Sequence, residues 1–339
     1  ELVDFAGQTR GEVPVPGSGA AAGFGGRAGD PETFFSFSSF TEPSSVYRFN
    51  VETGEVSQFT QPKLAFNPAD FLIEQIYYTS KDGTRIRMVI VRSKALAASG
   101  RTAPTLLYGY GGFNISQTPG FSPTRLAGVE QGGVLAVPSL RGGGEFGKAW
   151  HEAGRLSNKQ NVFDDFIAAA EYLKLMGYTG PDQLAIEGRS NGGLLVGAVV
   201  NQRPDLFAAA LPSVGVMDML RFDRFTAGRY WVDDYGYPER EPDFRNLLSY
   251  SPYHNIKEGA DYPAILVTTA DTDDRVVPGH SFKYAAALQH ADLGIKPRLI
   301  RIETRAGHGS GKPTEKVIEE YADMYSFIAY WTGLKISAK

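Results

Sequence analysis

The chain has 339 residues, a formal net charge of -4 and no cysteine. Its length allows one large domain with an appendage, and its charge offers no broad basic surface for a nucleic acid partner. The absence of thiols excludes disulfides, thiolate nucleophiles and cysteine-based metal sites. No apolar run is long enough to span a bilayer, so we expect no membrane partner, and the compartment stays open between cytoplasm and periplasm.

Residues 1–75 are predicted to form short antiparallel strands. Two β-prone runs, Phe34–Phe37 and Ser45–Phe49, precede a turn signal at Glu52–Gly54. The Gly- and Ala-rich stretch Gly17–Gly29 predicts a loop. These strands are too few to close a sheet of their own, so we expect an incomplete all-β domain with unpaired edges.

From residue 76 onward, apolar runs of strand length alternate with segments of helical period. This alternation is typical of a mostly parallel sheet with helices on both faces, and it predicts an open α/β domain over residues 76–339. The predicted strands are Thr105–Tyr108, Val134–Val137, Leu184–Glu187, Ala264–Val267 and Arg298–Arg301. The predicted helices are Phe163–Met176, Leu194–Val200 and Glu315–Tyr330.

The strongest local signal for chemistry is the G-x-S-x-G pattern at Gly188–Gly192. It stands after a predicted strand and before a predicted helix, which is the context of a nucleophile on a strained turn. Ser190 is therefore the candidate nucleophile. The first N–H groups of the following helix point toward the reaction centre, so the Asn191 amide is a candidate donor to a developing oxyanion.

A serine nucleophile needs a His base and an acid, and in this fold they follow in the order Ser, Asp, His. His308 lies between two glycines after the last predicted strand and is the candidate base. The acid follows the preceding strand, where Asp271, Asp273 and Asp274 compete for the role. Spacing alone leaves the three carboxylates open, since any of them can serve as a turn or cap.

The segment Arg141–Gly147 contains a G-x-G-x-x-G pattern that superficially resembles a dinucleotide fingerprint. A true fingerprint opens a helix at once and belongs to the first strand-helix turn of the series. This one lies in the middle of the series without a convincing helix start. We therefore expect no cofactor, and we assign no metal ligands.

Five longer motifs carry a resemblance to a known family: Tyr108–Asn114, Arg141–Gly147, Gly188–Gly193, Asp273–Pro278 and Ala306–Gly309. Through them, the stretch from about Tyr77 to Ile336 resembles the catalytic domain of prolyl oligopeptidase. That family consists of α/β-hydrolase peptidases capped by a β-propeller. The resemblance implies an α/β-hydrolase fold over residues 76–339 and the last part of a β-propeller over residues 1–75.

The resemblance also implies roles for single residues. The catalytic acid would be Asp273, the first aspartate of the Asp-Asp-Arg run, acting with Ser190 and His308. The phenol of Tyr110 would join the Asn191 amide as the second oxyanion donor, and one such donor is typically worth about 2.7–4 kcal/mol in the transition state.

A proline-sized S1 pocket is implied as well, with the indole of Trp231 under the pyrrolidine ring. Its walls would be Phe113, Val216, Tyr235 and Val276. Taken without the resemblance, aromatic residues four apart on a helix favour core packing. Arg275 matches an arginine that hydrogen-bonds the peptide carbonyl before proline, and its alternative is a salt bridge to Asp274.

Because the family carries a whole propeller before the catalytic domain, the chain resembles its C-terminal portion. We expect a partner in the N-terminal portion of the same enzyme, either as a separate chain or as a missing segment. Without it, unpaired strand edges and a partly uncovered sheet predict weak stability.

The sequence thus predicts a serine peptidase that hydrolyses short peptides on the carboxyl side of proline through an acyl-enzyme. An oligopeptidase that cuts after Arg or Lys would share the triad but would need carboxylates in S1. A lipase or esterase on the same fold is a further hypothesis, because fold and triad do not determine which leaving group is released. The alternative of a different class is a non-catalytic binding protein that kept the fold.

Overall fold

The computed structural model describes residues 1–337, which divide into two compact units. The first comprises Glu1–Phe71 and Thr118–Ala127, and the second comprises Leu72–Gln117 and the described residues from Gly128 onward. The division at residues 75 and 76, drawn from the change of sequence pattern, falls within the strand Phe71–Thr79 and stays a prediction.

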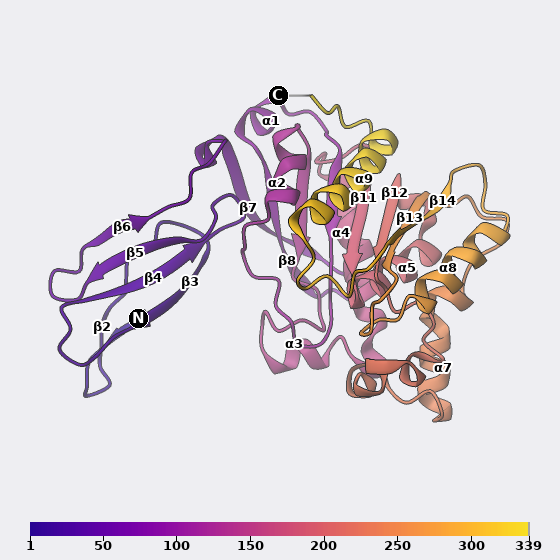
Figure 1. Cartoon of the computed structure of the whole chain (residues 1–339), viewed down its shortest axis with the longest axis horizontal. Helices are drawn as coiled ribbons and strands as arrows, with labels where there is room; N and C mark the ends of the chain where they lie inside the picture. Colours follow the sequence, from indigo (N-terminus) through magenta and orange to yellow (C-terminus); the bar gives the residue numbers. More distant parts are fainter. Residues whose placement is uncertain (338–339) are drawn as a thin grey trace. The chain divides into compact units, whose positions relative to one another are not determined.

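The first unit contains a four-stranded antiparallel sheet in the order β3-β4-β5-β6, drawn in indigo and purple in Figure 1. Its strands are β3 (Ala20–Gly25), β4 (Glu32–Ser38), β5 (Ser45–Asn50) and β6 (Val56–Thr60). A separate pair is formed by β1 (Leu2–Val3) and β2 (Thr9–Gly11). The predicted hairpins are confirmed.

The prediction of a loop over Gly17–Gly29 is wrong, because β3 lies within it. The small residues mark a close approach of two backbones: a Cβ on Gly23 would lie 3.1 Å from Phe34 O. Composition suggested a loop, but here the lack of side chains allows the strand to lie tightly on β4. The core of this unit is small and consists of Phe35, Phe37 and Phe49 with partly buried neighbours.

The second unit contains an eight-stranded sheet in the order β14-β13-β12-β11-β9-β10-β8-β7. The neighbours from β10 to β14 pair in parallel, and β8 pairs with β10 in the antiparallel sense. The strands are β7 (Phe71–Thr79), β8 (Arg85–Ser93), β9 (Thr105–Tyr108), β10 (Val134–Pro138), β11 (Leu184–Arg189), β12 (Ala209–Ser213), β13 (Ala264–Ala270) and β14 (Arg298–Glu303). All five predicted strands are confirmed, while β7, β8 and β12 were not predicted.

The predicted helices are confirmed as α4, α5 and α9. The helices are α1 (Lys94–Ser99), α2 (Pro123–Glu130), α3 (Lys148–Glu152), α4 (Gln160–Leu175), α5 (Asn191–Gln202), α6 (Val232–Tyr235), α7 (Glu241–Tyr250), α8 (Gly279–His290) and α9 (Thr314–Thr332). In the described part of the chain, no helix combines the length and apolarity needed to cross a bilayer.

The core of the second unit lies around β11 and the helix that follows it. β11 is buried from Leu184 to Gly188, and α5 is buried from Asn191 to Asn201. Helix α5 contacts both β11 and β12, and Figure 1 shows these elements in the middle of the domain. The turn between β11 and α5 is therefore held on both sides by packed, water-excluded structure, and this fixes its position.

Candidate active site

Ser190 occupies the turn between β11 and α5, with φ of 59° and ψ of -119°. This conformation is rare for a residue with a side chain and is kept only where its surroundings impose it. Ser190 N donates to Ser213 O of β12 at 2.9 Å. A Cβ on Gly188 would lie 2.2 Å from Gly192 O, so the glycines of the motif allow strand and helix to meet. The predicted strand, serine turn and helix are confirmed.

Asn191 and Tyr110, the two expected oxyanion donors, both lie beside this turn. Asn191 is the first residue of α5, and the first N–H groups of a helix have no partner within it. Tyr110 lines the same cavity as Ser190. Burial, with smaller contributions from Tyr108 and Asp234, raises the pKa of Tyr110 to about 12, so its phenol keeps its proton near neutral pH and can donate.

Asp273 and His308 meet between the ends of two neighbouring strands, β13 and β14. Asp273 Oδ2 lies 2.6 Å from His308 Nδ1, and the carboxylate has no exposed surface. Asp273 Oδ1 accepts from the backbone N–H of Arg275 at 3.0 Å and of Val276 at 2.9 Å. These bonds hold an acceptor against Nδ1, so the ring donates there and presents Nε2 for proton transfer.

Among residues 1–337, His308 makes no hydrogen bond or ion pair with Asp271 or Asp274. Asp271 Oδ1 accepts from Ala306 N at 3.3 Å, which fixes the beginning of the loop that carries His308. Hydrogen bonds from the backbone N–H groups of Arg305 and, to a smaller extent, Ala306 and Thr272 lower the pKa of Asp271. Within residues 1–337 no hydrogen bond joins Ser190 to His308, so the structure brings the base to the acid but leaves it short of the nucleophile. Catalytic contacts in unliganded enzymes commonly tighten only when substrate binds.

A cavity of about 260 Å³ opens beside Ser190. Its walls are mostly apolar and aromatic, and they are formed by Tyr110, Phe113, Ile115, Val216, Ala227, Trp231, Tyr235 and Arg275 together with Ser190. The rings of Phe113 and Tyr235 meet edge to face with centroids 5.3 Å apart. Phe222 packs behind them, edge to face with Tyr235 and stacked on Trp231. Such a rigid aromatic box suits a small flat ring.

Five of the six predicted substrate-binding residues line this cavity. Val276 does not: it is buried, and its N–H is bonded to Asp273. The side chain of Arg275 reaches the cavity, and the described residues contain no ion pair between Arg275 and Asp274. Ile115 and Ala227 were missed. Ile115 directly follows the Tyr108–Asn114 motif, and that position is the one signal that could have suggested it.

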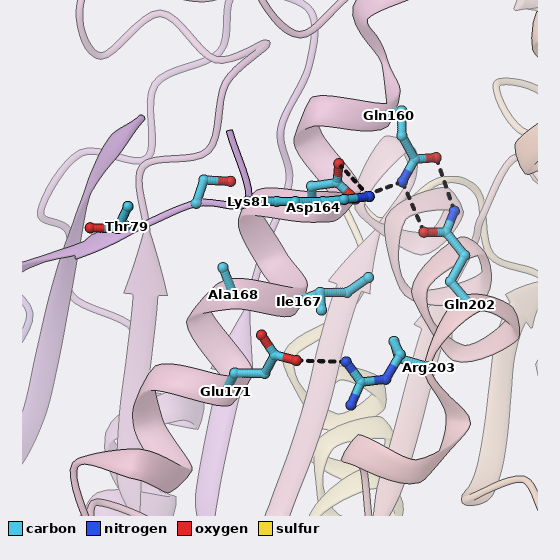
Figure 2. A pocket seen from close by; sticks show the side chains of 10 residues that line it. Thr79, Lys81, Gln160, Asp164, Ile167, Ala168, Glu171, Gln202 and Arg203 are labelled. Atoms are coloured by element: carbon cyan, nitrogen blue, oxygen red, sulfur yellow. Dashed lines mark hydrogen bonds and ion pairs between the residues drawn. The ribbon is translucent and has the colours of Figure 1, made fainter. Parts of the chain in front are cut away.

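A larger cavity of about 490 Å³ lies away from Ser190, along α4 and the end of α5 (Figure 2). Its charged and amide side chains pair with one another. Glu171 Oε1 accepts from Arg203 at 2.6 Å, the amides of Gln160 and Gln202 pair, and Lys81 faces Asp164 at 3.7 Å (Figure 2). Paired charges of this kind offer no poised nucleophile or base, so the smaller cavity at Ser190 is the candidate site.

The glycines of Arg141–Gly147 have a packing role. A Cβ on Gly142 would lie 2.9 Å from Gly111 O, in the loop that carries Tyr110. Over residues 1–337 no group of three or more His, Asp and Glu side chains is arranged to hold a metal ion. The site contains a serine, a His–Asp pair, two expected oxyanion donors and an aromatic cavity.

A strained serine at a strand-to-helix turn of a mostly parallel sheet, with an Asp–His pair after β13 and β14, is the arrangement typical of serine hydrolases with the α/β-hydrolase fold. The model of the prolyl oligopeptidase family matches residues 119–335, and the model of its N-terminal β-propeller domain matches residues 1–62. The chain belongs to the prolyl oligopeptidase family.

Individual relatives agree with this assignment. The chain is 51% identical to a prolyl endopeptidase of Elizabethkingia miricola over 96% of its own length and 46% of the relative. A solved prolyl endopeptidase structure matches 99% of this chain and 48% of its own with 58% identity and a TM-score of 0.90. Prolyl oligopeptidase B of Galerina marginata, solved with a 35-residue substrate, matches 94% of this chain and 46% of its own at 42% identity and a TM-score of 0.88. The chain thus spans less than half the length of the relatives it matches.

Proposed function

We propose that this chain carries the active site of a serine peptidase that hydrolyses short peptides on the carboxyl side of proline. Ser190 attacks the prolyl carbonyl, and His308 takes the proton and returns it to the leaving amine. Asp273 orients the imidazole, while Tyr110 and the Asn191 amide hold the oxyanion. Water then hydrolyses the acyl-enzyme with His308 as the base.

The observation that carries this proposal is the small aromatic cavity that opens directly at Ser190. Its volume of about 260 Å³ and its walls of Phe113, Trp231 and Tyr235 fit a pyrrolidine ring. Arg275 reaches the same cavity and can donate to the carbonyl of the residue before proline. The 2.6 Å contact between Asp273 and His308 supports the assignment of the acid and the base.

The lining of the cavity argues against cleavage after Arg or Lys. A cationic side chain in S1 needs a carboxylate, whereas the residues that line this cavity include none and do include the cation of Arg275. Esterase activity shares the same triad, and simple esters serve as a separate test of the nucleophile.

We also propose that peptide turnover by the whole enzyme involves the remaining part of the propeller. The match of residues 1–62 to the propeller model supports this, as does the length of the relatives. The N-terminal portion, supplied as part of a longer chain or as a second chain, would then limit access to short peptides.

The decisive experiment compares peptides that carry proline or alanine at the scissile position. We expect proline-selective hydrolysis that disappears in Ser190→Ala, because no other group replaces the nucleophile. The measurement is made with and without the N-terminal portion of a relative. Hydrolysis that persists in Ser190→Ala contradicts the assignment of the nucleophile, and equal rates on proline and alanine contradict the proline pocket.

A further inference from the structure

Lys159 contacts Gly111, Asn191 and the ring of Tyr235, in a position that the proposed mechanism does not use. It stands at the start of α4, and its side chain has no exposed surface. Lysine is almost never fully buried unless its charge is partnered. A buried ammonium behind an active site therefore calls for a specific reason.

The ammonium of Lys159 is satisfied by oxygens of the site itself. Nζ donates to Gly111 O at 2.9 Å and to Asn191 Oδ1 at 3.0 Å. It lies 3.9 Å from Asp234 Oδ2 and 5.4 Å from the centre of the Tyr235 ring. Gly111 directly follows Tyr110 in the chain, and Asn191 itself carries the other expected oxyanion donor, its backbone N–H.

The side chain of Asn191 joins these elements. Its Nδ2 donates to Tyr110 O at 2.5 Å, and its Oδ1 accepts from Tyr235 OH at 2.9 Å in addition to Lys159. A Cβ on Gly112 would lie 2.7 Å from Asn191 Nδ2, so the loop after β9 lies directly on this amide. One side-chain amide therefore links the loop of Tyr110, the start of α5 and a wall of the cavity.

Asp234 completes the arrangement from the opposite side. Its Oδ1 accepts from Phe113 N at 3.2 Å and contacts His151 Nε2 of α3 at 2.7 Å. Its Oδ2 is buried and has no hydrogen bond in the described part of the chain, so its charge is balanced by Lys159 at 3.9 Å. Phe113, which forms a wall of the aromatic cavity, is thus held by its backbone N–H to the buried Lys159–Asp234 pair.

We propose that Lys159 and Asp234 are positioning residues: their buried charge pair fixes Asn191, the Tyr110–Phe113 loop and Tyr235 as one unit, so that both oxyanion donors face Ser190. This inference rests on the proposed function and explains what would hold its two oxyanion donors in place. Preorganised donors stabilise the oxyanion without reorganising at the moment of reaction, and a small displacement removes much of that gain.

Lys159→Met tests the proposal, because methionine keeps the length of the side chain and removes the charge and the donors. We expect kcat on a prolyl peptide to fall about tenfold or more, with KM changed by less than about threefold, since the oxyanion donors act mainly on the transition state. A peptide aldehyde ending in prolinal, which forms a tetrahedral adduct with Ser190, should lose affinity by the same factor as kcat/KM. The affinity of the uncleaved peptide, measured in a Ser190→Ala background, should change little.

Lys283→Met is the matched control, because Lys283 also pairs with a buried aspartate, Asp218, and its other partner, Tyr253, lies outside the cavity lining. We expect it to lower thermal stability and to leave kcat per titrated active site unchanged. If Lys159→Met does not fold, Asp234→Asn takes its place. The asparagine keeps an oxygen that can accept from Phe113 N but removes the negative charge. We expect kcat to fall in Asp234→Asn, as in Lys159→Met.

The outcomes separate the two proposals. Wild-type failure on prolyl peptides in the presence of the N-terminal portion, with turnover of p-nitrophenyl acetate, overturns the proposed function, and the Lys159 comparison is then made on the ester. A folded Lys159→Met with wild-type kcat overturns the positioning role. Equal losses of affinity for the aldehyde and for the uncleaved peptide also overturn it, because they indicate general loosening of the cavity.

Discussion

Lys159 donates to Gly111 O and Asn191 Oδ1 from a position without exposed surface, and this burial also controls its protonation. Desolvation, opposed by the charge of Asp234, lowers the pKa of Lys159 to about 8. The titratable groups that interact with the Lys159–Asp234 pair include His151, Tyr110, Tyr235 and Tyr250. Burial raises the pKa values of these tyrosines, that of Tyr110 to about 12, so they keep their protons where Lys159 loses its own.

We therefore expect activity to fall as pH rises through about 8, and folding stability to move in the opposite direction. Between pH 8 and the ordinary lysine value of 10.5, the unfolded chain binds the proton that the folded chain has released. The unfolding free energy rises with pH in this window, by up to about 3 kcal/mol from this group.

The measurement is kcat/KM and the urea midpoint from pH 6.5 to 9.5 in wild type and Lys159→Met. The variant should lose both the alkaline fall in activity and the alkaline gain in stability. If kcat/KM fell equally at alkaline pH in wild type and in Lys159→Met, the fall would belong to the titration of another group.

Some residues of the candidate site could be predicted from the sequence, and others could not. Ser190 could be predicted because its signal is local: glycines two residues away on each side, a strand before and a helix after. The acid could not be chosen from spacing, since Asp271, Asp273 and Asp274 all follow β13, and only the path of the chain decides which one meets His308. Lys159 gives no sequence signal at all, because a lysine before a helix reads as a solvated side chain.

At the scale of elements, the meeting of β11 and α5 depends on Gly188. Gly188→Ala would place a methyl group 2.2 Å from Gly192 O, against backbone that has no room to move. We expect this substitution to destabilise the fold by about 3 kcal/mol and to reduce activity, because it pushes the serine turn out of place. Urea unfolding monitored by tryptophan fluorescence measures the effect.

Gly307→Ala is the matched control. A Cβ at Gly307 meets nothing within 4 Å, although the residue stands directly before His308. The substitution should therefore cost well under about 1 kcal/mol. Equal destabilisation by the two variants would show that loss of glycine itself, and not the contact with Gly192, is responsible.

Two of the strands that were not predicted, β12 and β3, consist mainly of small residues. β12 reads Ala-Ala-Leu-Pro-Ser, which carries neither β-branched residues nor alternation, and its place is set by pairing with β11 and β13. β3 was read as a loop for the same reason. In both, tertiary pairing overrides weak local preference.

For the whole molecule, the two units differ in the size of their cores. The first unit buries Phe35, Phe37 and Phe49, whereas the second buries a continuous cluster that runs from the strands into α4 and α5. Small cores give low opening free energies. We expect the amides of β4 and β5 to exchange with solvent faster than those of β11 and β13.

Hydrogen exchange followed by mass spectrometry tests this expectation. Phe49→Ala should accelerate exchange in β4 and β5 further and leave β11 and α5 protected, since it removes a fully buried ring from the first unit only. Uniform protection across both units, or loss of protection in β11, would contradict the difference in core size.

The site draws on segments from Tyr110 to His308, and the strands that carry them become neighbours only when β9, β11, β12, β13 and β14 have all paired. Parallel pairs of this kind form late, because each requires a long crossover to close first. An unfinished sheet holds the serine, the base and the oxyanion donors apart. If the proposed function holds, a chain that is still folding or is half unfolded would cleave nothing, including other copies of itself, because its catalytic groups are not yet together.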